Sequence, residues 1–471
     1  MRLTATLAAL LLGAGIAGAA VAQTTTDPTE PAFRALYKEL VETNTTLSTG
    51  SCTLAAERIA RHLTEAGYTE ADMHIYAAAD HLKEGGVVAV LKGRDPKAKA
   101  ILLLAHLDVV EAKREDWTRD PFTLIEEGGY FYARGTSDDK AMASIFTDLM
   151  IRFKKEGYRP KRDIKLALTC GEETSSAFNG AEWLAKNHKD WIDAAFAINE
   201  GAGGELDDAG KPVVMGIQSG EKVNQNFILE TTNPGGHSSQ PTPENALYHM
   251  AGALTRIAGY DFPVQFNDTT RAYFFGVAKL RGGEVGGAMT ALLKDPADAA
   301  ADKVVSRDKG WHSMLRTTCV ATTIQGGHAV NALPQHVKVN VNCRIFPGQS
   351  VDSVRDTLVK VINDPSVAIS LEQPLSPTPP PPPLSPAVLK PLEKVTAEMY
   401  PGVPILPSMS TGYTDGRQLN SVGIPTYGIE GMFGDPDGGG VHGLNERIRV
   451  KSLLDGRVFQ YRLVKLYADQ K

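Results

Sequence analysis

The chain contains few of the features that mark nucleic-acid-binding or membrane proteins. It has no basic tract and no clustered aromatic platform, which argues against a nucleic-acid partner. After the first 22 residues no apolar run reaches transmembrane length, so we expect no membrane partner. The 49 basic and 55 acidic residues give a net charge of -6, which favours solubility but says little about the fold.

Cysteine is also scarce, with only four in 471 residues. Cys52, Cys170, Cys319 and Cys343 allow three fully paired connectivities, and the sequence does not choose among them. Cys319 and Cys343 lie on neighbouring strand-like segments and could pair. Free, buried cysteines are equally compatible with the sequence.

The N-terminal 22 residues are predicted to be a signal peptide and not part of the fold. Arg2 gives a short positive start, the stretch from Leu7 to Ala20 is apolar, and Ala20-Val21-Ala22 is a small-residue cleavage site. We expect the mature protein to begin at Gln23 and to be periplasmic or secreted. No cysteine follows the cleavage site, which argues against a lipoprotein anchor.

Five short segments carry side chains that bind metals. They are AHLDVV with His106 and Asp108, GTSDDK with Asp138 and Asp139, CGEET with Glu172 and Glu173, INEG with Glu200, and VHGLNE with His442. Taken singly, each is more often surface chemistry or a satisfied hydrogen bond. Their joint occurrence points to a two-metal hydrolase.

Three of the segments directly follow apolar runs, at 101–105, 164–169 and 194–198. Runs of this kind are typical of buried parallel strands. In open α/β sheets the ligand site lies beyond the carboxyl ends of the strands. The sequence therefore predicts that His106, Glu172, Glu173 and Glu200 meet at one edge of a sheet.

The residue types also indicate which metal to expect. Imidazole and carboxylate ligands without thiolate suit Zn²⁺, with Co²⁺ or Mn²⁺ possible. Two ions about 3.5 to 4 Å apart need a shared anion, and a carboxylate can bridge them. Glu172 and Glu173 are adjacent at a strand end, so one can bind metal while the other acts as the base.

The five segments, in this order, resemble the co-catalytic zinc metallopeptidase and amidohydrolase family of aminoacylase, succinyl-diaminopimelate desuccinylase, carnosine dipeptidases and bacterial glutamate carboxypeptidase. LLLAHLDVVEA, DWTRDPF, GGYFYARGTSDDKAM and TTIQGGHAVNALPQHVKVNVNCRIFPGQSVDSV are most similar to its secreted and vacuolar carboxypeptidase branch. The resemblance covers essentially the whole mature chain. It implies an α/β fold: a mainly parallel sheet with flanking helices, plus an inserted α/β sandwich that serves as lid and dimerisation domain.

The resemblance also implies a role for each residue of the metal site. His106 and Glu200 would hold one zinc, Glu173 and His442 the other, and Asp138 would bridge them beside a cis peptide bond to Asp139. Asp108 would orient His106. Glu172 would be the general base that activates water for attack on an amide carbonyl, and then the acid that protonates the leaving amine.

Further family positions fall outside the metal motifs. His237 in NPGGHSSQP resembles the histidine that donates to the oxyanion, although a solvated loop histidine is the simpler interpretation of the sequence alone. Asn331 and Arg344 resemble substrate-binding residues, and the guanidinium of Arg344 suits a carboxylate, although a solvated sheet face is the alternative. Asp415 and Arg417 lie in a family loop near the substrate. We therefore expect a small peptide or N-acyl amino acid as substrate.

The domain organisation follows from where the catalytic motifs stop and resume. We predict catalytic segments at 23–219 and 374–471, with an inserted lid at 220–373. In the lid, the alternation from Val337 to Ile345 predicts a half-buried strand, and the apolar spacing that follows predicts a helix. The proline run at 374–386 predicts a stiff polyproline spacer at the lid junction, with an adaptor-domain ligand as the alternative.

Several alternatives remain open. A different two-metal hydrolase, such as a phosphoesterase, would need cationic phosphate clamps, which are not evident. A binding protein that kept the fold would be expected to have lost the base or a ligand, yet all are present. The lid allows a homodimer, but its length of roughly 150 residues could also support a monomer.

Overall fold

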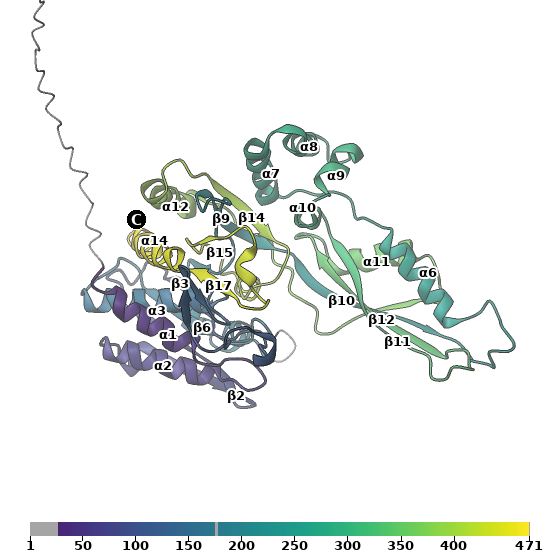
Figure 1. Ribbon diagram of the computed structural model, residues 1–471, viewed down its shortest axis with the longest axis horizontal. Coiled ribbons are helices and arrows are strands. Elements are labelled where there is room, and N and C mark those ends of the chain that lie inside the picture. The colour runs from purple at the N-terminus through teal and green to yellow at the C-terminus, as the bar shows by residue number, and fades with distance from the viewer. Residues whose placement is uncertain (1–26, 175–177, 471) are drawn as a thin grey trace, which may run out of the picture.

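The protein is described by a computed structural model over residues 27–174 and 178–470. The predicted signal peptide at 1–22 lies outside these residues. A large α/β body carries the N- and C-terminal parts of the chain, and a smaller layered unit projects from it (Figure 1). None of the described helices is long and apolar enough to cross a membrane.

A ten-stranded mixed sheet forms the centre of the large body. Strands β6, β3, β7 and β15 run parallel at its middle, with antiparallel neighbours on both sides. In sheet order the strands are β1 Met73–Ala78, β2 His81–Leu91, β6 Ile164–Thr169, β3 Ile101–His106, β7 Phe196–Asn199, β15 Thr426–Gly428, β9 Pro212–Glu221, β8 Gly204–Leu206 and β16 Phe433–Gly434, with β14 Ile405–Ser410 paired to β9. The predicted apolar runs are therefore confirmed as the central strands.

Helices cover both faces of this sheet, which is why its middle strands are apolar throughout. All six residues of β3 are buried. One face packs against α1 Glu30–Val41, α2 Cys52–Glu65, α3 Lys140–Lys155, α12 Pro386–Met399 and α14 Val450–Ala468. The other packs against α4 Gly180–Asn187, α5 Lys189–Ile192 and α13 Gly416–Ser421. A small separate sheet contains β4 Ile125–Glu127, β5 Tyr130–Tyr132 and β17 Arg447–Arg449.

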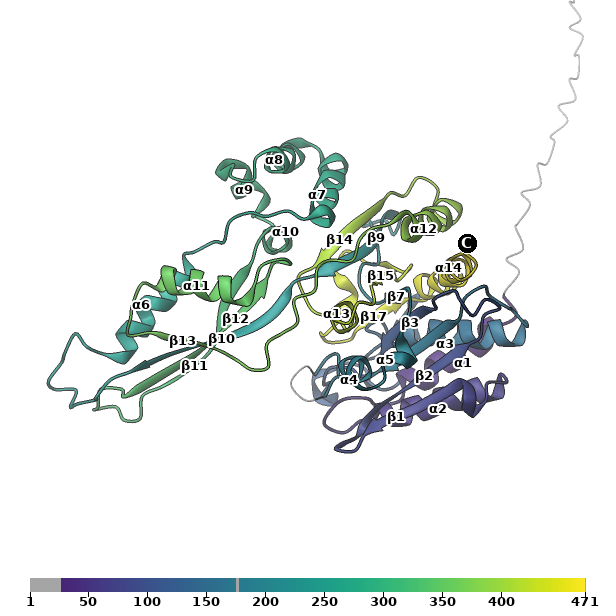
Figure 2. The same ribbon diagram turned by 180° about the vertical axis from the view of Figure 1, so that it is seen from behind.

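The projecting unit is an antiparallel sheet with helices on one face, as Figure 2 shows from behind. Its strands, in sheet order, are β11 Thr318–Gly326, β12 His336–Ile345, β10 Val223–Thr232 and β13 Ala368–Leu371. Helices α6 Ala246–Ala258 and α11 Val351–Ile362 cover the face to which the alternate residues of β12 point. The predicted strand and helix are confirmed. The boundaries at 220 and 373 stay a prediction.

Four further helices, not expected from the sequence, lie between α6 and β11. They are α7 Asp268–Arg281, α8 Gly283–Lys294, α9 Ala299–Val305 and α10 Lys309–Met314. Their core, which includes Phe274 and Met289, packs against Val214 of β9 and Leu406 of β14. This helical unit therefore rests on the large body, and it accounts for the unusual length of the predicted lid.

Both cysteine pairs are disulfide-bonded. Cys319 and Cys343 lie directly opposite each other on β11 and β12, which confirms the pairing considered from the sequence. Cys52 bonds to Cys170. That bond links the first residue of α2 to the segment that leads from β6 to Glu172.

The proline run is extended and packs on the large body. The Ser219 hydroxyl donates to the carbonyl of Pro382 at 2.7 Å, and the Tyr427 hydroxyl donates to that of Pro383 at 2.6 Å. The proline segment, which leads from the projecting unit back to the large body, is therefore hydrogen-bonded to β9 and β15.

Candidate active site

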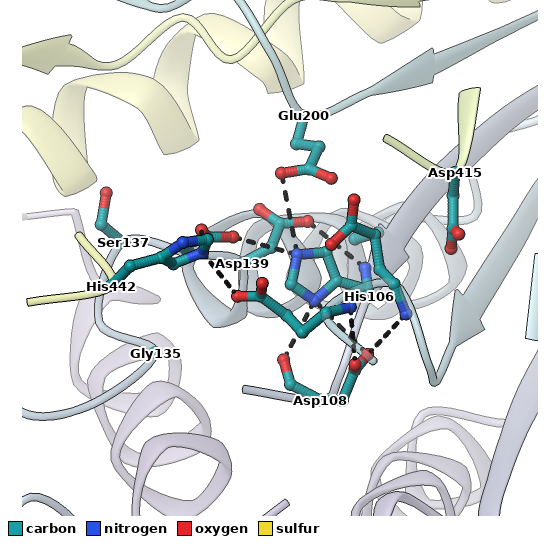
Figure 3. Close-up of polar contacts among 12 residues, drawn as sticks. His106, Asp108, Gly135, Ser137, Asp139, Glu200, Asp415 and His442 are labelled. Atoms are coloured by element: carbon teal, nitrogen blue, oxygen red, sulfur yellow. Dashed lines mark hydrogen bonds and ion pairs between the residues drawn. The ribbon is translucent and has the colours of Figure 1, made fainter. Parts of the chain in front are cut away.

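The polar side chains singled out in the sequence meet at the carboxyl edge of the parallel strands. His106 is the last residue of β3, Glu200 directly follows β7, and Glu172 and Glu173 follow β6 by a few residues. These strands are neighbours in the sheet, so their ends deliver the side chains to one place. His442 reaches the same place from the loop before β17 (Figure 3).

One group of ligand atoms forms around His106. Its Nε2 lies 3.0 Å from Asp138 Oδ1 and 3.7 Å from Glu200 Oε2. The ring is almost fully buried, and its Nδ1 is 3.0 Å from the backbone carbonyl of Asp108. The contact of Nδ1 with the Asp108 carbonyl fixes the orientation of the ring, so that Nε2 points toward Asp138 and Glu200.

A second group forms around His442. Its Nε2 lies 2.9 Å from Glu173 Oε1 and 3.1 Å from Asp138 Oδ2. Asp138 thus turns one carboxylate oxygen to each histidine. The peptide bond between Asp138 and Asp139 is cis, as the resemblance implies.

Asp108 acts on the Glu172–Glu173 loop more directly than on the imidazole of His106. Its carboxylate accepts the backbone N–H groups of Glu172 at 3.3 Å and Glu173 at 3.0 Å. The nearest distance from that carboxylate to His106 Nδ1 is 3.6 Å, longer than the 3.0 Å to its backbone carbonyl. Asp108 therefore positions both the histidine and the two glutamates.

The site holds more acid than its two histidines can neutralise. Burial raises the pKa of Glu172 well above its usual value, and the charge of Glu200 adds to this. Burial raises the pKa of Glu200 to about 7. Burial opposes ionisation of Asp138 as well, yet hydrogen bonds from His106 and His442 lower its pKa.

These residues fit divalent metal ions. His106, Asp138 and Glu200 can each point a ligand atom to one spot, and Asp138, Glu173 and His442 to another. Glu200 Oε1 is buried and has no hydrogen-bond partner among the described residues. Buried carboxylates without cations are costly, so a cation at each spot would stabilise the cluster.

Glu446, which the sequence interpretation did not single out, holds the bridging loop. Its buried carboxylate accepts the backbone N–H groups of Gly135 at 3.0 Å, Ser137 at 2.9 Å and Asp138 at 3.2 Å, and it pairs with Arg134 at 2.8 Å. Since Glu446 lies four residues after His442, it ties the two loops of the second ligand group together. The only sign of this role in the sequence is that Glu446 belongs to the VHGLNE segment, which also contains His442.

A cavity of about 410 Å³ opens beside the ligand groups. Asp138, Asp139, Glu200 and Glu430 line it on the metal side. The other described lining residues are Ser137, Gly201, Ala202, Gln218, Ser410, Tyr413, Thr414 and Val441. Its volume is that of a small-molecule site.

The predicted substrate residues fall at opposite ends of the projecting sheet. Arg344 pairs with Asn224 near the junction, whereas His237 and Asn331 come together beyond the far end of β10, where the Ser238 N–H donates to the Asn331 carbonyl at 3.0 Å. Ten residues of β10 separate these ends by roughly 30 Å. One hinge motion cannot bring His237 and Arg344 of the same chain to one substrate, which corrects the expectation from sequence.

The two remaining predicted substrate residues are buried. Asp415 accepts hydrogen bonds from Thr169 at 2.7 Å and Asn179 at 2.6 Å, so each of its oxygens already has a protein partner. Arg417 stacks over Tyr413 at 4.3 Å, and its Nε and Nη1 have no partner among the described residues. Burial lowers the pKa of Arg344, and the nearby charge of Arg417 lowers it further.

Two histidines and several carboxylates at the edge of an α/β sheet define a class, the metal-dependent hydrolases. The chain belongs to peptidase family M20/M25/M40, whose family model matches residues 102–466. The protein is therefore an enzyme of the metallopeptidase and amidohydrolase type and catalyses metal-dependent amide hydrolysis.

Among curated relatives, the chain is 29% identical over 385 residues to the human N-fatty-acyl-amino acid synthase/hydrolase PM20D1, covering 80% of this chain and 75% of the relative. It is 27% identical over 408 residues to the probable carboxypeptidase S-like 2 of Dictyostelium discoideum, covering 83% and 76%.

Two solved structures share the fold. The M20 family metallo-carboxypeptidase Sso-CP2 of Sulfolobus solfataricus superposes with a TM-score of 0.68 at 19% identity, covering 93% of this chain and 99% of that one. Human carnosine dipeptidase 1 gives 0.63 at 15% identity, covering 93% and 96%. The predicted fold class and family are confirmed.

Proposed function

We propose that the enzyme hydrolyses an amide bond in a small substrate with a free carboxylate, as a carboxypeptidase, dipeptidase or N-acyl-amino-acid hydrolase with two metal ions. The observation that carries this proposal is the placement of Asp138, whose two oxygens lie 3.0 Å and 3.1 Å from the facing nitrogens of His106 and His442. A single carboxylate shared by two ligand groups is the arrangement that a two-metal site requires.

The residues suit two Zn²⁺ ions, with Co²⁺ or Mn²⁺ as alternatives. His106 and Glu200 would hold the first ion, Glu173 and His442 the second, and Asp138 both. When bound, such ions supply Lewis-acid polarisation of a carbonyl and make a coordinated water more acidic. Nδ1 of His106 contacts the Asp108 carbonyl at 3.0 Å, and this contact would keep Nε2 directed toward the first ion.

Glu172 is the residue we assign to proton transfer. Glu173 contacts His442 at 2.9 Å. Glu172 makes no ion pair with His442 among the described residues, and the charges of His106 and Asp415 act on its carboxyl. Its carboxylate would take a proton from the attacking water and deliver it to the leaving amine. The N–H groups of Glu172 and Glu173 both donate to Asp108, which holds the backbone of this loop in place for both steps.

We assign Arg344 to binding of the substrate carboxylate. It is half-buried at the junction end of β12, and the nearby Arg417 has N–H groups without a partner among the residues that the structure describes. Two neighbouring guanidinium groups favour an anion between or beside them.

We therefore expect substrates with a free carboxylate to be hydrolysed at least about 10-fold more efficiently than their carboxamide analogues. Arg344→Ala should remove most of this difference by raising KM for the free acids, and the partly exposed Arg355→Ala on α11 is the matched control. Steady-state kinetics on acid and amide pairs measure the effect. Equal kcat/KM values for acids and amides in the native enzyme would contradict the role of Arg344.

We also propose that the projecting sheet forms a homodimer through β11. This strand is the edge of its sheet, and Val320 and Ile324 are 62% and 58% exposed. A long exposed edge strand is a template for pairing with a second copy. In such a dimer, the distal position of His237 and Asn331 would let them serve the partner's metal site.

Co-expression of two inactive variants tests this arrangement. If His237 acts across the dimer, a chain with His237→Ala and a chain with Glu172→Ala together restore about a quarter of native activity, because half of the randomly formed dimers have one intact site. Ile324→Lys should yield monomers and abolish this recovery, whereas Val359→Lys on the helical face should not. No recovery from co-expressed chains that do form mixed dimers would exclude the exchange.

Export is the remaining part of the proposal. The predicted signal peptide at 1–22 supports it, and so do the two disulfides, because such bonds persist mainly in oxidising compartments.

A further inference from the structure

The wall of the cavity next to the proposed metal ligand Glu200 contains a side chain that no step above uses. Gln218 lies on β9, is 9% exposed, and lines the cavity beside Glu200. Its carboxamide makes no hydrogen bond with any residue that the structure describes, and its polar atoms are not among the fully buried unpaired ones, so they face the open space of the cavity. A buried amide that faces an open cavity without a partner is available to a ligand.

Two glycines leave room for the side chain of Gln218. Gly201 has a φ of +134°, and a Cβ there would lie 2.7 Å from Gln218 Oε1, closer than atoms of this kind approach. A Cβ at Gly428 would lie 2.8 Å from the Cβ of Gln218. Because both neighbours lack side chains, Gln218 lies directly over the peptide that follows the metal-ligand candidate Glu200.

The rest of that wall is polar or small. Gly201, Ala202, Ser410 and Thr414 contribute no large apolar surface, and the larger apolar groups among the described lining residues are Tyr413 and Val441. An aliphatic group placed against Gln218 would displace water from its amide without offering it a hydrogen bond. A group that donates and accepts hydrogen bonds would pair with it.

We propose that Gln218 determines substrate specificity, and that it binds a carboxamide, hydroxyl or peptide group carried next to the scissile amide. This inference rests on the proposed amide hydrolysis and adds the chemical class of the substrate. The enzyme then discriminates against aliphatic isosteres, because a site built to form a hydrogen bond rejects an analogue that lacks one.

The test uses the full-length enzyme with two substrate series. One series varies the acyl-side residue and the other varies the amino acid that carries the free carboxylate, each with matched pairs such as Gln against Met and Ser against Ala. In one of the two series the varied group enters the cavity. In that series, native enzyme should prefer the polar member of each pair by at least about 10-fold in kcat/KM. Gln218→Met, which keeps the volume of the side chain, should bring that ratio close to one and leave the ratio in the other series unchanged.

The control is Gln470→Leu, at the far C-terminal end of the chain, where the side chain bonds only to the Ala387 carbonyl. Thermal unfolding of each variant checks that the fold is intact. A Gln218→Met enzyme that loses activity equally toward every substrate, or ratios that do not change in either series, would overturn the proposal. No hydrolysis of any member by native enzyme would instead reject the proposed function itself.

Discussion

Replacing Glu172 by glutamine should lower kcat by about 10²- to 10⁴-fold, the usual contribution of a positioned proton-transfer group. The substitution keeps the shape of the side chain and the backbone N–H bonds to Asp108, so the loop should stay in place. KM should change little, because Glu172 is assigned to the chemical step and not to substrate binding. Steady-state kinetics on the preferred substrate measure the effect.

Metal content separates this result from simple damage to the site. Glu172→Gln should bind as much zinc as native enzyme, since we assign no metal to Glu172. The exposed Glu115→Gln is the matched control and should be indistinguishable from native enzyme. A fully active Glu172→Gln enzyme would exclude Glu172 as the base. A variant that has lost metal would mean that Glu172 is a ligand.

Replacing Asp138 by alanine should reduce bound zinc from two ions per chain to one or fewer. Each oxygen of Asp138 faces one histidine, so the change removes a ligand from both positions and the anion between them. Activity should fall at least as far as in the Glu172 variant, because both the water and the carbonyl lose their positioned cation.

Elemental analysis of the zinc-saturated variant measures this outcome directly. Asp138→Asn should give an intermediate loss of metal, since it keeps an oxygen ligand but not the charge. The exposed Asp116→Ala is the control. Two tightly bound ions in Asp138→Ala would rule out a bridging role, and a single ion in the native enzyme would do the same.

The central sheet could be predicted because its strands are buried on both faces. The apolar runs that became β3, β6 and β7 are short, and each ends at a polar motif, so strand direction and the position of the site followed together. The alternation that became β12 was equally clear, because one face of that strand is covered by α6 and α11.

What escaped prediction depends on contacts between distant segments. The core of α7–α10 includes Val214 and Leu406, which are far from these helices in the chain. Glu446 holds the Asp138 loop through backbone N–H groups about 310 residues earlier, and backbone donors leave no trace in side-chain patterns. The separation of His237 from Arg344 depends on the length and direction of β10. Neither property can be deduced from the short motifs that contain these two residues.

The measurement that tests the central claim most directly is zinc titration of the metal-depleted enzyme, followed by hydrolysis of N-acyl amino acids and dipeptides. We predict no turnover after chelation, and a rise in activity that levels off near two equivalents of Zn²⁺ per chain. Full turnover in the chelated enzyme, or two bound ions without hydrolysis of any amide that carries a free carboxylate, would contradict a two-metal amide hydrolase.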